Sequence, residues 1–371
     1  MDFQARPDWA GRLGVRQSAL SVASLDGLIV SGLPNIRYLT GFEGSSAMLV
    51  LTTDEVILIS DGRYALTIQE GMRKGALAAV RFEQVSARYD LTLVDVLKSH
   101  RLARVGFEAA HVTVAGLRGW RQQLDEVVWV ETDDLVERQR LIKDAWEQDV
   151  FRRGGVAIAR VAARLGEWVR PGRSEKEIAH EIERGLEDAG FSAPAFATIV
   201  ASGPNSAHPH ARPTARRVES GDLVVLDFGG VLDGYCLDLT RMCAVGRVSD
   251  SAQALVAAVR EAHHAAVDAV RPGVETGAID RAARNVLDAH GLSQAFLHGT
   301  GHGLGLEVHE APRIARVGAD PPEVIAAGMV FTIEPGAYVP GVGGVRLEDD
   351  VLVTSTGCEV LTDGPRELLV V

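Results

Sequence analysis

The chain has few cysteines, no long apolar run and no excess of positive charge. Its 371 residues include three cysteines, and their odd number and the absence of a Cys-x-x-Cys spacing argue against a disulfide framework. No apolar stretch approaches the roughly 20 residues of a membrane-spanning helix. The first residues, including Asp2, Arg6 and Asp8, lack the apolar segment of a signal peptide. We therefore expect a cytoplasmic protein without a membrane partner.

The acidic balance makes a nucleic-acid partner equally unexpected. Lysine and arginine number 38 against 50 aspartates and glutamates, a formal net charge of −12, whereas nucleic-acid binders carry basic surfaces. The composition, 46% hydrophobic and 24% charged, is that of a globular protein with a sizeable core. A length of 371 residues suits two domains better than one.

The first third of the chain alternates strand-like and helix-like segments. This alternation predicts an α/β layer domain with a mixed sheet and helices, which we end at residue 135 where a charged connecting helix begins, leaving 136–371 as the second domain. The expected strands lie at 27–30, 47–51, 56–59, 104–107 and 127–130, and the expected helices lie near 64–74, 88–100 and 113–124.

The second domain contains an internal repeat. The tetrapeptide Val-Arg-Pro-Gly occurs at 169–172 and at 270–273, each time after an alanine-rich helical stretch. Three further residues recur at the same offset: an isoleucine at 178 and 279, a leucine at 186 and 287, and a glycine at 190 and 291. We expect two α+β units, each a helix, a Pro-Gly break, a second helix with a glycine C-cap and then strands, whose strands pair into one curved sheet.

Five residues of the second domain form a candidate metal set. Each lies at the end of a strand-like run, close to a glycine, proline or arginine. The five residues are Asp227, Asp238, His302, Glu334 and Glu348. Four carboxylates and one imidazole suit a pair of hard divalent cations better than a single zinc, and such a pair activates water. The turn sequence Leu-Asp-Gly at 232–234 predicts a hairpin that brings the two aspartates together. Taken alone, each aspartate is equally well a turn or cap residue.

Other polar residues surround this set in the sequence. His298, His302 and His309 are interleaved with glycines, an unusual pattern for core packing, and the spacing does not match a dinucleotide fingerprint. Arg346 lies two positions before Glu348, which predicts the same strand face and a role in orienting a ligand carboxylate. An ordinary surface ion pair is the alternative. The Pro/Gly-rich segment 202–213 carries two histidines and an arginine, which are either a pocket wall or solvated loop residues.

These motifs resemble the M24 "pita-bread" metallopeptidase family. The segments Leu-Asp-Phe-Gly, Asp-Leu-Thr-Arg, Gly-Thr-Gly-His-Gly-Leu-Gly, Ile-Glu-Pro-Gly and Arg-Leu-Glu-Asp occur intact and in the family's order, over roughly 140–371. The segments 35–42 and 61–64 resemble the creatinase-like N-terminal domain of the family members that cleave Xaa-Pro bonds. The resemblance therefore implies a pita-bread catalytic domain and either a prolidase (Xaa-Pro dipeptidase) or an Xaa-Pro aminopeptidase.

The resemblance also implies roles for individual residues. It places two divalent cations at the site, Mn²⁺ first and Co²⁺ or Zn²⁺ as alternatives, with Asp227 on one cation, His302 and Glu334 on the other, and Asp238 and Glu348 bridging. Glu334 would move the proton, His210 would contact substrate or leaving group, and His298 and His309 would bind the scissile carbonyl or the proline region. We count His210, His309, Glu334 and Arg346 as catalytic. The family's Leu-Pro-His-Gly loop is here His-Pro-His-Ala, followed by Arg212.

Arg212 favours the dipeptidase. An Xaa-Pro dipeptidase must bind the carboxylate of its substrate, and arginine does this with a bidentate fork. His298, His309 and Arg212 are therefore the expected substrate-binding residues, for proline-containing dipeptides or short peptides. The alternative is an Xaa-Pro aminopeptidase. Metal-free creatinase-like hydrolases and pita-bread histone chaperones share the fold, but all five ligands stand here and no charged tail is present. The resemblance further implies a homodimer.

Overall fold

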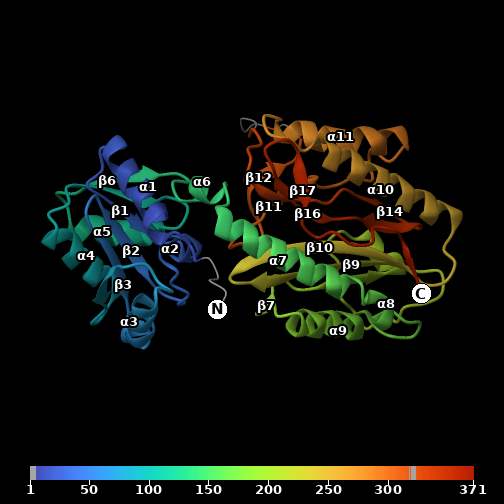
Figure 1. The fold of residues 1–371 in the computed structure, drawn as a ribbon, viewed down its shortest axis with the longest axis horizontal. Coiled ribbons are helices and arrows are strands. Elements are labelled where there is room, and N and C mark those ends of the chain that lie inside the picture. The colour runs from blue at the N-terminus through green and yellow to red at the C-terminus, as the bar shows by residue number, and fades with distance from the viewer. Residues whose placement is uncertain (1–5, 317, 319–322) are drawn as a thin grey trace. The chain divides into compact units, whose positions relative to one another are not determined.

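The computed structural model describes residues 6–316, 318 and 323–371. The chain divides into two compact units, residues 1–140 and 141–371, so the division lies slightly after the expected boundary at 135 (Figure 1). Among the described residues, no helix has both the length and the apolar character needed to cross a membrane. The three cysteines are free, Cys236 and Cys243 being buried and Cys358 partly exposed.

The first unit is built on a six-stranded mixed sheet. Its order is β4-β3-β2-β1-β5-β6, with β1–β2 and β2–β3 antiparallel and the other pairs parallel. The strands are β1 (Gly27–Val30), β2 (Met48–Thr52), β3 (Val56–Ser60), β4 (Arg81–Gln84), β5 (Arg104–Glu108) and β6 (Val128–Thr132). The helices are α1 (Trp9–Val22), α2 (Leu33–Thr40), η1 (Gly62–Tyr64), α3 (Ala65–Lys74), α4 (Tyr89–Ser99), α5 (Val114–Gln123) and α6 (Glu137–Arg140).

All strands and helices expected in this unit are present, and four further elements are not foreseen. They are α1, with a weak apolar period, α2, which spans only eight residues, η1, and the edge strand β4, which has no buried residue. The central strands instead carry short continuous apolar runs, since both faces of the sheet are covered. Ile29, Val50, Ile57 and Phe107 pack there against α4 and α5.

The second unit contains the remaining helices and two larger sheets. The helices are α7 (Ala145–Ala162), α8 (Leu165–Trp168), α9 (Glu175–Asp188), η2 (Gly203–Ala207), α10 (Asp250–Ala269) and α11 (Thr276–Ala289). The first sheet has β7 (Ala193–Pro194), β8 (Ile199–Ser202), β9 (Leu223–Leu232), β10 (Tyr235–Ala244) and β18 (Leu369–Val370). The second has β11 (Gly301–Gly303), β12 (Glu310–Ile314), β13 (Val330–Ile333), β16 (Asp349–Val353) and β17 (Cys358–Val360), and β14 (Gly336–Val339) pairs with β15 (Gly343–Arg346).

The repeat is visible in the paired helices. α9 and α11 each have 14 residues, and the glycines before them, Gly172 and Gly273, share a φ of +84°. The expected capping box of Ser174 and Glu177 begins α9, whereas α11 has no side-chain cap. The expectation of one curved sheet is wrong in detail, because the strands of the two halves form separate hydrogen-bonded sheets.

Two cores hold the second unit together. One joins α7, α8 and α9 to one face of β9 and β10, and the other joins α10 and α11 to the opposite face and to the second sheet. Figure 1 shows the strands between these two groups of helices. Phe228 belongs to the first core and Val225 to the second, because successive side chains of a strand point to opposite faces.

Candidate metal centre

The hairpin of β9 and β10 brings the two aspartates together. Its two-residue turn, Asp233-Gly234, has φ values of +49° and +90°, as a type I′ turn requires. In the resulting register Asp227 lies opposite Thr240, and Asp238 precedes Thr240 by two residues. All three side chains therefore lie on one face, with the two carboxylates as diagonal neighbours. The predicted hairpin is confirmed.

The second sheet supplies the other three candidates. His302 is the central residue of β11, and Glu334 directly follows β13, where its amide donates to the carbonyl of Thr300 at 2.7 Å. Glu348 lies between β15 and β16 and accepts a hydrogen bond from the Thr240 hydroxyl at 2.6 Å. That bond joins β10 of the first sheet to the residue just before β16 of the second sheet, so candidates of the two halves meet.

The ligand atoms lie close together. His302 Nε2 is 3.9 Å from Asp238 Oδ2 and 3.6 Å from Glu334 Oε1. Asp238, His302 and Glu348 each offer one ligand atom, and these atoms lie within 4.8 Å of one another. Asp227 joins the group from the adjacent strand. The five residues predicted from sequence are thus gathered around one space.

The charges of this space are unbalanced without cations. Burial, followed by neighbouring carboxylates, raises the pKa values of Asp238 and Glu348 well above their ordinary range. Burial also raises the pKa of Glu334 to about 7. Like charges this close disfavour one another's ionisation, whereas bound cations would favour it. The Oδ1 atoms of Asp227 and Asp238 are buried and have no hydrogen-bond partner, as expected of oxygens that serve as metal ligands.

His302 is also prepared to bind a metal. Its Nδ1–H donates a hydrogen bond to the carbonyl oxygen of Gly303 at 3.1 Å, which leaves the Nε2 lone pair facing the carboxylates. Burial lowers the pKa of His302 to about 4, so the ring is neutral at physiological pH. A neutral imidazole and four carboxylates form a hard, oxygen-rich set, which fits a pair of divalent first-row cations.

Arg346 orients a ligand carboxylate, although not the one adjacent to it in sequence. β15 ends at Arg346 and β16 begins at Asp349, so Arg346 and Glu348 do not share a strand face, and that expectation is wrong. The guanidinium instead pairs with Asp227 and donates from Nε to the Thr240 hydroxyl at 3.2 Å. Thr240 thereby links Arg346 to Glu348.

Tyr338 connects Arg346 to His298. Its hydroxyl accepts from Arg346 Nη1 at 2.8 Å and lies 3.0 Å from His298 Nε2. His298 Nδ1 lies 2.8 Å from the carbonyl oxygen of Gly299, so the ring donates there and accepts from Tyr338. His298 Nδ1 is also 4.0 Å from Glu334 Oε2. Both ring nitrogens therefore have protein partners, and a substrate group must compete for them.

The other predicted substrate residues are exposed side chains. His309 is exposed, and its ring centroid lies 4.4 Å from that of His302. His210 and Arg212 are exposed in the loop after η2. Burial raises the pKa of Asp227 while Arg346 and, to a smaller extent, His210 lower it, which puts His210 within electrostatic reach of the ligands. For Arg212 no comparable link to the ligands is seen.

Three positioning residues are not foreseen. Thr240 and Tyr338 are described above, and Asp280 of α11 accepts a hydrogen bond from the Thr300 hydroxyl at 2.9 Å. Thr240 had a usable signal, because it lies two residues after Asp238 and so on the same strand face. Tyr338 and Asp280 had none, since they are brought to the site by tertiary contacts alone.

A second cluster in the first unit has the residue types of a metal site but another role. Glu108, His111 and Glu137 lie within 4.8 Å of one another. However, Glu108 already accepts from the amides of Ser31 and Gly32 at 2.7 and 2.8 Å. Its carboxylate therefore holds the N-terminus of α2, and we assign it no metal.

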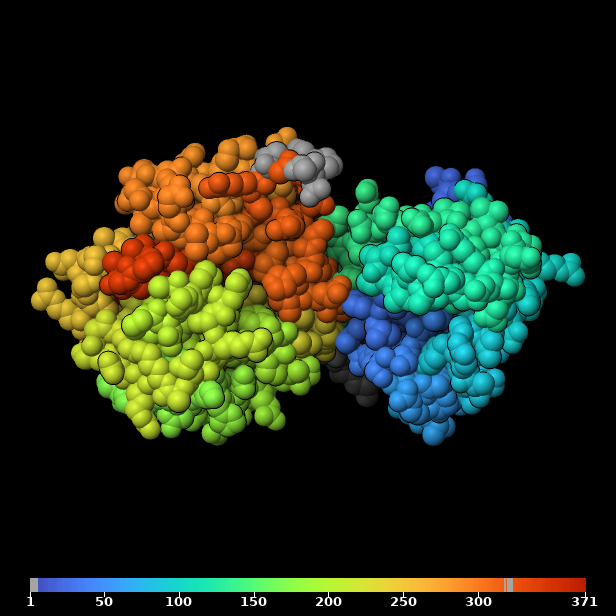
Figure 2. Space-filling view, turned by 180° about the vertical axis from the view of Figure 1, so that it is seen from behind, coloured from blue at the N-terminus to red at the C-terminus, as the bar shows by residue number. Residues whose placement is uncertain are grey.

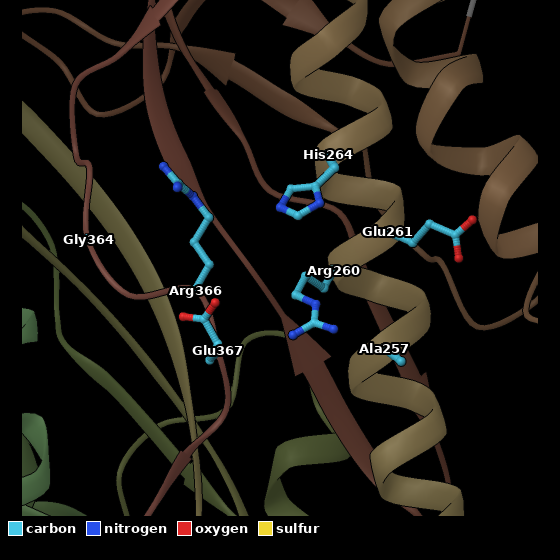
Figure 3. Close-up of a pocket in the computed structure, with 7 residues that line it drawn as sticks. All are labelled: Ala257, Arg260, Glu261, His264, Gly364, Arg366 and Glu367. Carbon is cyan, nitrogen blue, oxygen red and sulfur yellow. The ribbon is translucent and has the colours of Figure 1, made fainter.

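A hollow of about 630 Å³ lies away from the candidate ligands. It is lined by Ala257, Arg260, Glu261, His264, Gly364, Arg366 and Glu367. Figure 3 shows Arg260 and His264 projecting from α10 toward the segment of Gly364, whereas Glu261 points away. The hollow has two arginines against two glutamates and contains none of the metal-ligand candidates, so we do not place the reaction there.

Known proteins resemble the chain over nearly its whole length. Residues 149–355 match metallopeptidase family M24, and residues 12–142 match the creatinase/prolidase N-terminal domain. An Xaa-Pro dipeptidase of Pyrococcus furiosus is 31% identical over 348 residues, covering 93% of this chain and 96% of the relative. An uncharacterized peptidase of Bacillus subtilis, YqhT, is 34% identical over 349 residues, with the same coverage of 93% and 96%.

Solved structures give the same result. The Xaa-Pro dipeptidase of Bacillus anthracis superposes with a TM-score of 0.92 at 32% identity, covering 98% of this chain and 100% of that one. The X-Pro aminopeptidase of Thermotoga maritima gives 0.86 at 30% identity, covering 96% and 100%. With its metal-ligand candidates gathered between two sheets and both family matches in place, the chain belongs to metallopeptidase family M24.

Proposed function

We propose that this protein is a metal-dependent Xaa-Pro dipeptidase, which hydrolyses the peptide bond before proline in dipeptides. The observation that carries the proposal is the set of four carboxylates, three of them buried, and a neutral imidazole around one space, in which one oxygen each of Asp227 and Asp238 has no hydrogen-bond partner. Relatives named Xaa-Pro dipeptidase, which cover nine-tenths of the chain, support the substrate class.

The proposed metal ligands divide between two cations. Asp227 would hold one, His302 and Glu334 would hold the other, and Asp238 and Glu348 would bridge them. When bound, two such cations supply an activated water and a Lewis acid for the carbonyl. We propose Mn²⁺, with Co²⁺ or Zn²⁺ as alternatives, because the hard oxygen-rich set accommodates several first-row ions.

The chain's own groups complete the reaction. A carboxylate oxygen of Glu334 accepts the proton of the attacking water and passes it to the departing proline nitrogen. His309, exposed beside His302, donates a hydrogen bond to the carbonyl oxygen as charge develops on it. His298 and His210 border the proline region. Arg346 acts indirectly, by holding Asp227 in place.

A dipeptidase must also recognise the carboxylate of its substrate. Arg212 is exposed and bears no ion pair to a described residue, so its guanidinium is free to bind that group. An Xaa-Pro aminopeptidase is the second candidate, favoured by the likeness to the T. maritima enzyme. The two candidates differ in whether a longer peptide is accepted.

The deciding experiment compares a dipeptide and a tripeptide. Metal-stripped protein is assayed on Ala-Pro and Ala-Pro-Ala, with and without added Mn²⁺. Restored cleavage of Ala-Pro alone establishes the dipeptidase, and cleavage of both peptides establishes the aminopeptidase. Failure to cleave either peptide with any divalent cation refutes both. If Arg212→Ala cleaves both peptides in the wild-type ratio, Arg212 is not the carboxylate clamp.

Variants of the ligands test the site itself. His302→Ala and Glu334→Ala should lose at least about a thousandfold in kcat, in the range seen when a catalytic group is removed. Both should keep the folded circular dichroism spectrum. Turnover retained at saturating Mn²⁺ contradicts the assignment.

The cellular setting is part of the same proposal. Three free cysteines suit a reducing cytoplasm. A homodimer is proposed from the family resemblance, and sedimentation of the metal-loaded protein tests it.

A further inference from the structure

One buried carboxylate outside the metal centre collects an unusual number of hydrogen bonds. Glu175, the first residue of α9, is fully buried. Its Oε1 accepts from the Ser202 amide and hydroxyl, both at 2.8 Å, and its Oε2 accepts from the Thr214 amide at 2.9 Å and hydroxyl at 2.6 Å. Asn205 Nδ2 lies 3.0 and 3.2 Å from the two oxygens.

These donors lie at or near the two ends of the loop that carries the exposed substrate-binding candidates. Ser202 ends β8 before the loop, Asn205 lies in η2, and Thr214 follows Arg212 by two residues. Glu175 therefore fastens both ends of the segment 203–213. His210 and Arg212 project from it as exposed side chains.

The middle of the same loop is fastened to the metal centre. Arg346 Nη1 donates to the Pro209 carbonyl at 3.2 Å, and the Gly344 amide donates to the Ser206 hydroxyl at 2.9 Å. A Cβ on Gly344 would lie 1.9 Å from the Ser206 carbonyl oxygen, so this close approach requires glycine. In Figure 2 the yellow-green surface of α9 and the following segment meets the orange-to-red surface of the later segments.

We propose that Glu175 is a positioning residue that sets substrate affinity, by holding loop 203–213 so that His210 and Arg212 face the substrate. The inference rests on the proposed function for its substrate. The Glu175 carboxylate suits this task because it can accept hydrogen bonds from every donor around it. In a glutamine at this position, one carboxylate oxygen is replaced by an NH2 group, which cannot accept a hydrogen bond. Whichever way the side-chain amide is turned, at least one of the surrounding donors loses its acceptor.

The test compares Glu175→Gln with a matched variant of the same helix turn. Glu177 also accepts two hydrogen bonds at the start of α9, from the Ser174 amide at 2.7 Å and its hydroxyl at 2.8 Å, but none from the loop. Glu177→Gln therefore reproduces the loss of a negative charge in the first turn of α9 without touching the loop. Both variants are compared with the wild type in the Mn²⁺-loaded full-length protein.

The first readout is independent of activity. Amide hydrogen exchange of Thr214, whose N–H donates to Glu175, should accelerate about tenfold in Glu175→Gln, the equivalent of one hydrogen bond to a charged group. It should be unchanged in Glu177→Gln. Equal exchange of Thr214 in wild type and Glu175→Gln overturns the proposal.

The second readout separates positioning from catalysis. KM for Ala-Pro should rise about tenfold in Glu175→Gln, with kcat within about twofold and metal content unchanged. If loop exchange accelerates while KM stays at the wild-type value, Glu175 anchors the loop but does not set affinity, and the proposal is wrong. If the wild-type protein cleaves neither peptide, the proposed function is refuted instead. The exchange rate of the Thr214 amide then still tests whether Glu175 anchors the loop.

A variant on the loop side guards against misfolding of Glu175→Gln. Thr214 is exposed, and Thr214→Val removes one donor to Glu175 while preserving shape and the amide. KM should rise in the same direction by a smaller factor. An unchanged KM and unchanged loop exchange in Thr214→Val count against the proposal.

Discussion

Tyr338 shows how single atoms organise the site. Its O–H donates to His298 Nε2 at 3.0 Å, and its oxygen accepts from Arg346 Nη1 at 2.8 Å. Burial raises the pKa of Tyr338, so the phenol stays protonated and keeps donating. The chain from Asp227 through Arg346 and Tyr338 to His298 thus fixes the acceptor form of that histidine.

Removing this hydroxyl should impair the enzyme without removing its metal. In Tyr338→Phe, His298 Nε2 loses the hydroxyl that donates to it and Arg346 loses an acceptor, so we expect kcat to fall about tenfold. The unfolding free energy should fall by about 1–2 kcal/mol, for one buried hydrogen-bonded network. Steady-state kinetics, metal analysis and urea unfolding measure the three quantities. Loss of bound metal would show that Tyr338 supports the ligands instead.

Glu334 should make the metal-free protein sensitive to pH. Burial raises its pKa from 4.5 to about 7, so the folded state holds a proton that the unfolded state releases in this interval. The stability owed to this group is therefore fully present below pH 4.5 and is lost as pH rises from there through about 7.

The direction of this pH effect on stability can be tested by comparing the wild type with a variant that cannot ionise at position 334. In metal-free protein, Glu334→Gln should come close to the wild type at pH 4.5 and exceed its unfolding free energy at pH 8 by about 3 kcal/mol. Urea unfolding of both proteins at both pH values provides the measurement. A variant that is less stable than wild type at pH 8 contradicts the predicted burial of a charged Glu334.

At the scale of elements, α7 packs more closely on the second sheet than a side chain permits. A Cβ at Gly155 would lie 2.1 Å from the carbonyl oxygen of Leu361. The amide of Leu361 in turn donates to the Asp350 carbonyl at 2.8 Å, so this contact continues into β16. Glycine here serves helix packing at the cost of helix propensity.

Gly155→Ala should therefore destabilise the protein although alanine favours helix. The propensity gain is about 1 kcal/mol, whereas overpacking against backbone costs about 1–3 kcal/mol or more. We expect a net loss of about 1–2 kcal/mol, measured by urea unfolding. Gly14→Ala in α1 is the matched control, since nothing lies within 4 Å of its Cβ, and it should gain up to about 1 kcal/mol. Equal effects of the two substitutions would disprove the packing argument.

At the scale of the whole molecule, the metal candidates belong to one unit only. All five lie within residues 141–371, and they come from both repeated halves. Their mutual repulsion opposes folding of the second unit unless cations bind. Metal binding and folding of that unit are therefore coupled.

Metal removal should lower the stability of the second unit. Saturation at about 100 times Kd contributes about 2.7 kcal/mol, equivalent to about 5–10 °C in Tm for a unit of this size. Calorimetry with Mn²⁺ and with EDTA measures the shift, and His302→Ala should show little of it. An unfolding temperature that is the same with Mn²⁺ and with EDTA contradicts the proposed metal site.

The sequence alone determined the local elements and the list of ligands. Short apolar runs located the central strands, Asp233-Gly234 located the hairpin, and the repeated Val-Arg-Pro-Gly located α9 and α11, because these signals depend on neighbours in the chain. The two-unit division and the family were also readable from motifs, and the comparisons confirm the family.

Tertiary structure alone decided how the ligands are held. Arg346 pairs with Asp227 rather than the ligand beside it in sequence, and the repeats form two sheets rather than one. Tyr338 contacts His298, which is 40 residues away in the chain. Glu175 contacts Ser202 and Thr214, which are 27 and 39 residues away. No periodicity encodes such pairs. Long-range contacts follow from the packing of whole elements, and only the folded chain specifies them.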